Sequence, residues 1–149
     1  MSPIKTVDRL ELERFMGNWY VIANIPTALE KKAYNAVESY HLDDNGTVAT
    51  TFTFRKGGFD GPLKTYRLRG FVQDDSNAVW GMRFLWPFKA DYRIIYLESD
   101  YSIAVVGRSK RDYLWVMACG PVIPETRLRE ILEYTEYDLS QVRMVPQKW

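Results

Sequence analysis

Few side chains in this sequence belong to the types that carry out catalysis or bind metals. The chain holds one histidine, His41, and one cysteine, Cys119. A dedicated zinc site needs more nitrogen and sulfur ligands than these, and a serine–histidine–aspartate triad would have to use His41, which its strand turns outward. Cys119 could act as a nucleophile, although a lone cysteine is more often inert packing. No metal and no cofactor are expected.

Glu38 is the acidic side chain whose position is most informative. In the segment AVESYHL, Ala36, Glu38, Tyr40 and Leu42 fall on one side of an extended chain. Because Tyr40 and Leu42 suit the interior, Glu38 is directed inward with them. A buried carboxyl group is costly unless it is paired or protonated. Glu38 could bond a ligand or a tyrosine hydroxyl, or it could reach solvent at the rim, and the sequence favours the rim.

The composition limits the classes of protein to which the chain can belong. Its 149 residues are expected to form one domain, 1–149, with a sizeable core. The net charge of +1, from 20 basic and 19 acidic residues, gives no electrostatic case for a nucleic-acid partner. Aromatic residues make up 15% of the chain, and such rings fill a core or line a pocket for an apolar guest. No stretch approaches the ~20 apolar residues of a membrane-spanning helix.

The elements that must position these side chains are nearly all strands. Runs of β-branched and aromatic residues, separated by short Gly-, Asp- and Asn-rich segments, predict antiparallel strands joined by hairpins. Residues 8–15 are long enough for one or two helical turns, and a helix is expected from Pro124 with Leu128, Ile131 and Leu132 on its apolar face. The strands are predicted near 18–25, 36–42, 47–55, 64–73, 77–86, 91–98, 102–107, 112–118 and 142–145.

This order of elements predicts an all-β fold. Eight consecutive antiparallel strands and one late α-helix favour a closed up-and-down β-barrel with a short ninth strand, because closure removes exposed strand edges. A two-sheet sandwich is the alternative, but its crossings usually need longer connections. An eight-stranded barrel is just wide enough to be filled by its own side chains or to hold one small ligand, and the pattern leaves both open.

Period-two alternation separates the inward-facing residues of each strand from the outward-facing ones. The inward set is rich in aromatic residues and methionines such as Met117, which either pack the core or adapt to a guest. The strand near 91–98 is apolar on both faces, and Tyr92, Ile94 and Tyr96 are its preferred inward residues. The side chains predicted to line a ligand cavity are Glu38, Tyr40, Phe52, Phe54, Tyr66, Trp80, Met82, Phe84, Tyr92, Tyr113 and Trp115.

Three segments resemble the motifs of the lipocalin family. Gly17-Asn18-Trp19-Tyr20 resembles the family signature at the start of the first strand, Ser99-Asp100-Tyr101 the motif between the sixth and seventh strands, and residues 111–118 the eighth strand. The similarity runs in order over about residues 7–147 and is closest to the bacterial lipocalins and their relatives, which include apolipoprotein D. The resemblance implies that Gly17 and Trp19 close the narrow end of a one-ligand barrel.

One position departs from the family pattern. The third motif of lipocalins places an arginine after the eighth strand, packed over the tryptophan of the first motif, and that position here falls on Cys119. A cation over an indole ring contributes ~0.5–2 kcal/mol. Its absence should weaken the closed end unless another group covers Trp19, and Arg14 and Arg143 are the candidates. The same place near the closed end argues against access of a substrate to Cys119.

The resemblance implies a non-enzymatic protein that transports or stores a small hydrophobic or amphipathic ligand, such as a fatty acid or a lysophospholipid. The alternatives are an enzyme that acts on a lipophilic substrate through Glu38 or Cys119, and a membrane-associated structural protein with a filled barrel. The family further implies the periplasm or outer membrane, with peripheral membrane association, if an export signal has been removed. A cytoplasmic location is expected if Met1 is the native start. Both a monomer and a homodimer stay open.

Overall fold

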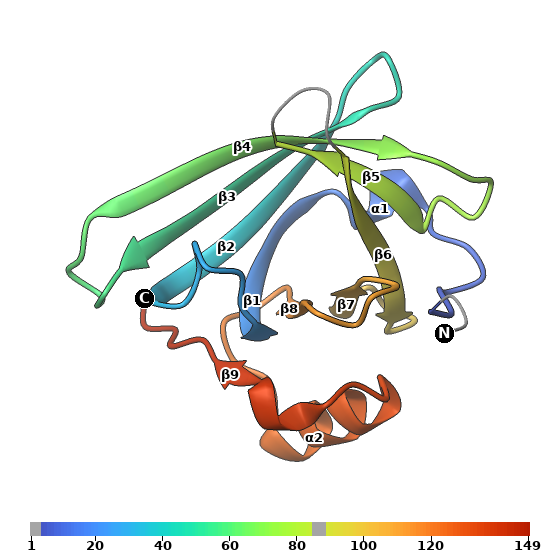
Figure 1. Cartoon of the computed structure of the whole chain (residues 1–149). Coiled ribbons are helices and arrows are strands. Elements are labelled where there is room, and N and C mark those ends of the chain that lie inside the picture. Colours follow the sequence, from blue (N-terminus) through green and yellow to red (C-terminus); the bar gives the residue numbers. More distant parts are fainter. Residues whose placement is uncertain (1–3, 85–88) are drawn as a thin grey trace.

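The computed structural model describes residues 4–84 and 89–149, and within them the chain forms strands, two α-helices and a short 3-10 helix (Figure 1). The predicted end of the fifth strand, with Trp86, lies outside the described residues. The helices are α1 (Leu12–Phe15), α2 (Glu125–Tyr134) and η1 (Leu139–Gln141). The strands are β1 (Gly17–Ile25), β2 (Ala33–Leu42), β3 (Val48–Lys56), β4 (Leu63–Val72), β5 (Val79–Arg83), β6 (Lys89–Leu97), β7 (Ile103–Gly107), β8 (Leu114–Ala118) and β9 (Arg143–Met144).

The strands close into a barrel, which confirms the predicted architecture and excludes the sandwich. Strands β2 to β8 pair in chain order, and β1 pairs antiparallel with both β8 and β2. Closure depends on β1, whose first residues pair with β2 and whose later residues pair with β8 across an irregularity between Val21 and Ala23. An extra residue at such a point bends the strand, so that it can serve two neighbours. Strand β9 pairs with Ala23 and Asn24 of β1.

The buried apolar side chains form two groups on the two sides of the barrel wall. The inner group fills one end of the barrel and includes Trp19, Trp80 and Ile94. The outer group packs the wall against α2, where Leu128 and Ile131 are buried. The predicted apolar face of this helix is therefore confirmed. No helix in the described part of the chain has the length and apolar composition needed to cross a bilayer.

The inward register predicted for β6 is right for its first half and wrong for its second. Tyr92 and Ile94 belong to the inner group, but Tyr96 packs with the outer group and its ring lies 5.5 Å from that of Tyr134 on α2. The pairing of β6 with β7 shifts between Ile94 and Tyr96. Because one extra residue reverses the side on which later side chains lie, this bulge moves Tyr96 to the outside.

The closed end of the barrel lies beside α1 (Figure 1). Gly17 enters β1 with φ of +109°, a conformation that side chains other than glycine rarely adopt. The indole of Trp19 is 2% exposed, and its Nε1 donates to the carbonyl oxygen of Phe15 at 2.9 Å. The rings of Phe15 and Trp19 are 4.9 Å apart. The segment before β1 thus folds back as a lid over the tryptophan.

The arginines considered as covers for Trp19 stack elsewhere. Arg14 lies 4.2 Å from the ring centre of Tyr101, and Arg143 lies 5.9 Å from the ring of a β2 tyrosine. Neither candidate stacks on the indole, and the aromatic ring in contact with Trp19 among the described residues is that of Phe15. Arg14 instead ties α1 to the turn between β6 and β7, where it also donates to the carbonyl oxygen of Ser99 at 3.3 Å.

Candidate ligand-binding site

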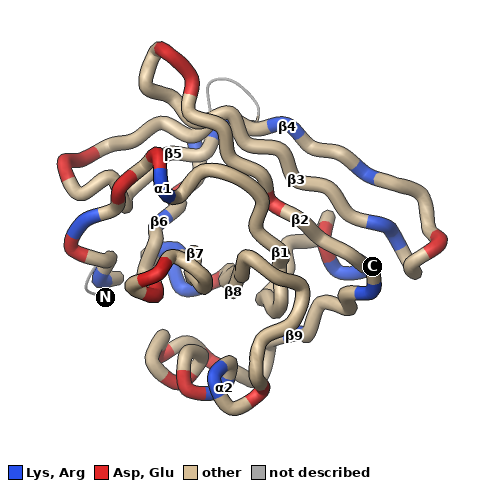
Figure 2. Tube along the Cα trace, turned by 180° about the vertical axis from the view of Figure 1, so that it is seen from behind, with Lys and Arg blue, Asp and Glu red and all other residues tan. Residues whose placement is uncertain are grey.

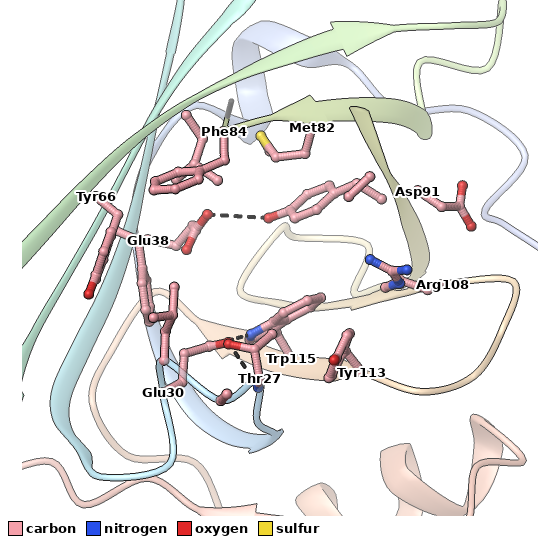
Figure 3. Close-up of a pocket in the computed structure, with 16 residues that line it drawn as sticks. Thr27, Glu30, Glu38, Tyr66, Met82, Phe84, Asp91, Arg108, Tyr113 and Trp115 are labelled. Atoms are coloured by element: carbon pink, nitrogen blue, oxygen red, sulfur yellow. Dashed lines mark hydrogen bonds between the residues drawn. The ribbon is translucent and has the colours of Figure 1, made fainter. Parts of the chain in front are cut away.

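The end of the barrel away from α1 is hollow. Its cavity has a volume of about 450 Å³, within the range of about 300–1,000 Å³ that is typical of small-molecule sites. The cavity brings together eight of the eleven side chains predicted to line it (Figure 3). These are Glu38 from β2, Phe52 from β3, Tyr66 from β4, Met82 from β5, Phe84 just after β5, Tyr92 from β6, Tyr113 just before β8 and Trp115 from β8.

Three predicted lining residues, Tyr40, Phe54 and Trp80, do not border the cavity. The rings of Tyr40 and Trp80 lie 5.5 Å apart and pack around Phe15 in the filled closed end. The ring of Phe54 is buried against those of Phe52 and Tyr66, at 5.4 and 6.0 Å. Strand alternation predicted correctly that these side chains face inward, but it carries no information about depth along the barrel.

The wall also contains residues that the sequence did not single out. Alternation places Leu68 on the inward side of β4 with Tyr66, although Leu68 was not among the predicted lining residues. The others lie in the loop between β1 and β2 or near strand ends at the open end, where a two-residue period gives no signal. They are Thr27, Ala28, Leu29, Glu30, Ala90, Asp91 and Arg108.

Glu38 lies inside the cavity and not at a solvated rim, which corrects the interpretation that the sequence favoured. Its residue is 9% exposed, and its Oε1 accepts a long hydrogen bond of 3.5 Å from the hydroxyl of Tyr92. Burial, followed by the nearby charge of Glu30, raises the pKa of Glu38 from 4.5 to about 8, although the hydrogen bond from the Tyr92 hydroxyl lowers it. At neutral pH the Glu38 carboxyl group is therefore mainly protonated and can donate a hydrogen bond.

Two tyrosines form the polar floor below Glu38. The hydroxyls of Tyr92 and Tyr40 are hydrogen-bonded to each other, and Sδ of Met117 lies 3.7 Å from the hydroxyl oxygen of Tyr40. Burial, followed by the charge of Glu38, raises the pKa of both hydroxyls well above the ordinary value. Both tyrosines therefore stay neutral, and the ring of Tyr92 stacks between those of Trp80 and Trp115 at 5.5 and 6.0 Å.

Glu30 is a second buried acid, and it lies at the edge of the cavity in the loop between β1 and β2. Its Oε1 accepts a hydrogen bond of 2.7 Å from Nε1 of Trp115. Its Oε2 accepts from the backbone nitrogen and the hydroxyl of Thr27, at 3.2 and 2.5 Å. These donors fix the carboxylate against the indole and attach the loop to β8 (Figure 3).

The other side chains considered for catalysis or metal binding lie outside the cavity. Cys119 is exposed beyond the end of β8, and its Sγ donates to the carbonyl oxygen of Tyr101 at 3.2 Å. Partial burial and the charge of Asp100 raise the pKa of this thiol, which disfavours the reactive thiolate. His41 faces outward and lies 3.6 Å from Asp43. Within residues 4–84 and 89–149, no three histidine, cysteine, aspartate or glutamate side chains form a group that could hold a metal ion.

A closed eight-stranded barrel, plugged at one end beside a Gly-Asn-Trp sequence and hollow at the other, defines a protein of the lipocalin class. Residues 10–147 match the family model described as a lipocalin-like domain, and the chain belongs to this family. Lipocalins bind small hydrophobic ligands, and they are generally binding and transport proteins.

The similar curated proteins are lipocalins of the bacterial type. The chain is 26% identical over 156 residues to temperature-induced lipocalin-1 of Arabidopsis thaliana, an alignment that covers 97% of this chain and 83% of the relative. It is 27% identical over 129 residues to the outer membrane lipoprotein Blc of Citrobacter freundii, covering 87% of this chain and 73% of the relative. The Blc protein of Escherichia coli K12 is 26% identical, with 97% and 83% covered. The resemblance seen in the sequence is thereby confirmed.

Solved structures of low sequence identity share the fold. Insecticyanin of Manduca sexta superposes with a TM-score of 0.75 at 14% identity, covering 97% of this chain and 84% of that chain. The cockroach allergen Per a 4 superposes with a TM-score of 0.71 at 17% identity, covering 99% and 94%. At these identities the likeness concerns the architecture alone.

Proposed function

We propose that this protein binds and transports or stores a small amphipathic lipid, of the fatty acid or lysophospholipid kind, inside its cavity. The observation that carries the proposal is the hollow of about 450 Å³ and its mainly apolar wall. Phe52, Leu68, Met82 and Phe84 offer a continuous surface for an alkyl chain, and each buried methylene contributes about 0.8 kcal/mol. An open cavity also argues against the alternative of a structural protein with a filled barrel.

We propose a binding role and not catalysis. Cys119, the candidate nucleophile, lies outside the cavity and keeps its proton. Glu38, the candidate catalytic acid, lies within it, but the hydrogen-bond partner of its carboxyl group among the described residues is a neutral tyrosine hydroxyl and not a nucleophile or a metal ion. The Glu38 carboxyl group is therefore placed to form a polar contact with a bound ligand.

Filling the cavity is expected to abolish lipid binding. Leu68→Trp places a large ring system against the apolar wall, and we expect the affinity for a bound lipid to fall at least about tenfold because the alkyl chain loses contact area. Native mass spectrometry with a panel of long-chain fatty acids and lysophospholipids measures the change. In the unchanged protein, quenching of tryptophan fluorescence provides a second readout, since Trp115 lines the cavity.

Arg67→Trp is the matched control, because Arg67 lies next to Leu68 on β4 and is exposed. This variant should bind as the unchanged protein does. Equal binding by both variants would place the lipid outside the barrel. Failure of the unchanged protein to bind any member of the panel at high micromolar concentration would contradict the proposed function.

We further propose that the open end of the barrel loads its lipid from an anionic membrane surface. Leu29 and Leu63 at this end are 56% and 55% exposed, although both are large and apolar. Lys31 and Lys32 follow Leu29 in the loop between β1 and β2, and the backbone nitrogen of Lys56 donates to the carbonyl oxygen of Pro62, next to Leu63. All three lysines are exposed (basic residues are blue in Figure 2). Apolar side chains surrounded by lysines suit the interface of a bilayer with anionic lipids. The Blc relatives are outer membrane lipoproteins, which supports a periplasmic or outer-membrane location for this chain.

Reversing the charge at this open end is expected to weaken membrane binding. Since each lysine near an anionic surface contributes about 1 kcal/mol, the double variant Lys31→Glu/Lys32→Glu should bind anionic vesicles at least about 30-fold more weakly. Sedimentation with vesicles of phosphatidylglycerol and phosphatidylcholine measures this. The control is Lys5→Glu/Arg9→Glu, which changes two exposed cations near the N-terminus. An equal loss in both variants would show attraction by overall charge and would contradict a specific face.

A further inference from the structure

The charges that line the cavity are unevenly distributed. Three carboxyl groups, of Glu30, Glu38 and Asp91, and one guanidinium group, of Arg108, border it. Asp91 is compensated, because it accepts hydrogen bonds from Arg93 Nε at 2.9 Å and from the backbone nitrogen of Ser109 at 2.7 Å. Nε of Arg108 lies 3.0 Å from the carboxylate of a neighbouring aspartate at the mouth. Glu30 and Glu38 are therefore the unbalanced acids of the cavity: among the described residues, no guanidinium or ammonium group pairs with either of them.

The two glutamates lie on the same part of the wall. Glu30 is held against the indole of Trp115 by neutral donors, which suit an ionised carboxylate but supply no positive charge. Glu38 points into the same cavity with a single long hydrogen bond from Tyr92 among the described residues (Figure 3). Glu38 of β2 pairs directly with Phe52 of β3, so this acidic edge lies beside the apolar side chains of β3, β4 and β5. The cavity thus offers an apolar surface for an alkyl chain next to two acidic side chains for a polar group.

We infer that the cavity prefers single-chain amphiphiles whose head carries a fixed positive charge, such as a quaternary ammonium, over those whose head is a carboxylate. This inference rests on the proposed lipid-binding function and specifies the head group. A cation beside Glu30 and Glu38 gains two carboxylate partners and the aromatic faces of Trp115, Tyr66 and Phe52. A carboxylate in the same place would bring a further negative charge to an acidic edge that is shielded from water.

The preference has a dependence on pH that distinguishes it from simple surface attraction. In the free protein the Glu38 carboxyl group holds a proton up to about pH 8. A cation binds best when that proton has left. Its affinity should therefore increase as the pH is raised toward about 8, by up to about tenfold for each pH unit. The affinity of a carboxylate should fall over the same range. The other titratable groups that face this part of the cavity are Glu30 from the β1–β2 loop, Tyr40 from below, Tyr66 from β4, Asp91 and Tyr92 from β6, Arg108 after β7 and Tyr113 before β8.

The test compares three probes with the same alkyl chain below their micelle-forming concentrations. These are dodecyltrimethylammonium, dodecanoate and the neutral monododecanoyl glycerol, titrated calorimetrically at about pH 6 and about pH 8. We expect the ammonium probe to bind at least about tenfold more tightly than dodecanoate at the higher pH, with a smaller ratio at the lower pH. Glu38→Gln should remove most of this pH dependence. Glu125→Gln makes the same change on the exposed surface of α2 and should leave it unaltered.

Each result of this comparison bears on one claim. If dodecanoate binds as tightly as the ammonium probe at both pH values, or if Glu38→Gln retains the full pH dependence, the inferred preference is wrong and the lipid-binding function stands. If the ammonium probe binds undiminished to the cavity-filled Leu68→Trp variant, its binding is adsorption to the surface and the inference is likewise overturned. If none of the three probes binds, the proposed function itself fails.

Discussion

Replacing Trp19 with alanine is expected to lower the free energy of unfolding by about 3–5 kcal/mol, the usual cost of removing a large buried aromatic side chain. Trp19 is 2% exposed, contacts the ring of Phe15 at 4.9 Å and donates to its carbonyl oxygen at 2.9 Å. The substitution leaves a cavity under α1 and removes the contact that holds this lid. Equilibrium unfolding in urea, followed by far-ultraviolet circular dichroism, measures the loss.

Trp149→Ala is the matched control for this experiment. Trp149 is 71% exposed, and its ring meets the edge of one tyrosine ring, that of Tyr20, at 5.6 Å. Its removal should cost less than about 1 kcal/mol, as is usual for surface substitutions. If Trp19→Ala were as mild as this control, the closed end of the barrel would not depend on the indole, and the role assigned to the first motif would be wrong.

The stability of the protein is expected to fall with rising pH through the contribution of Glu38. The folded protein holds the Glu38 proton up to about pH 8, whereas the unfolded chain releases it near the ordinary value of 4.5. The stabilisation is thus fully present below about pH 4.5 and is lost as pH rises through about 8. The slope is about 1.4 kcal/mol per pH unit in this window, and the total is about 3–5 kcal/mol.

Comparison with Glu38→Gln isolates this effect, because glutamine has nearly the same shape and does not titrate. Asp91, Asp100 and Asp138 have lowered pKa values and act in the opposite direction. Their effects cancel in the difference between the free energies of unfolding of the two proteins. The unchanged protein should lose stability relative to the variant as pH rises from about 5 to about 8 in urea titrations. Parallel stability curves over this range would show that Glu38 is ionised or solvated in the folded protein.

The two effects concern opposite parts of one barrel. The closed end is stabilised by dense aromatic packing around Trp19, Phe15 and Trp80. The hollow end contains a buried acid, which costs stability when ionised and is retained where a guest could contact it. Cavities and buried acids are both destabilising, so a protein with both in its binding region needs stabilising packing in another part of the barrel.

The order of the strands and the closed barrel followed from the sequence alone. Alternation, hairpin-length connections and the glycine and tryptophan at the start of β1 act over short distances along the chain, so they can be read without coordinates. The inward-facing side of β3 was predicted correctly from Phe52 and Phe54, and Val48 and Thr50 on the same side are buried with them. The helical face of Leu128 and Ile131 was predictable for the same reason.

Which side chains line the cavity was decided by the tertiary structure. Phe52 borders the hollow and Phe54 does not, although both face inward, because depth depends on the tilt and closure of the sheet. The bulge in β6 moved Tyr96 to the outside, and no residue pattern marks that extra residue. Glu30 reaches Trp115 across 85 positions of sequence. A period of two residues determines the side of a strand that a side chain occupies, whereas only closure of the barrel determines which distant side chains share one space.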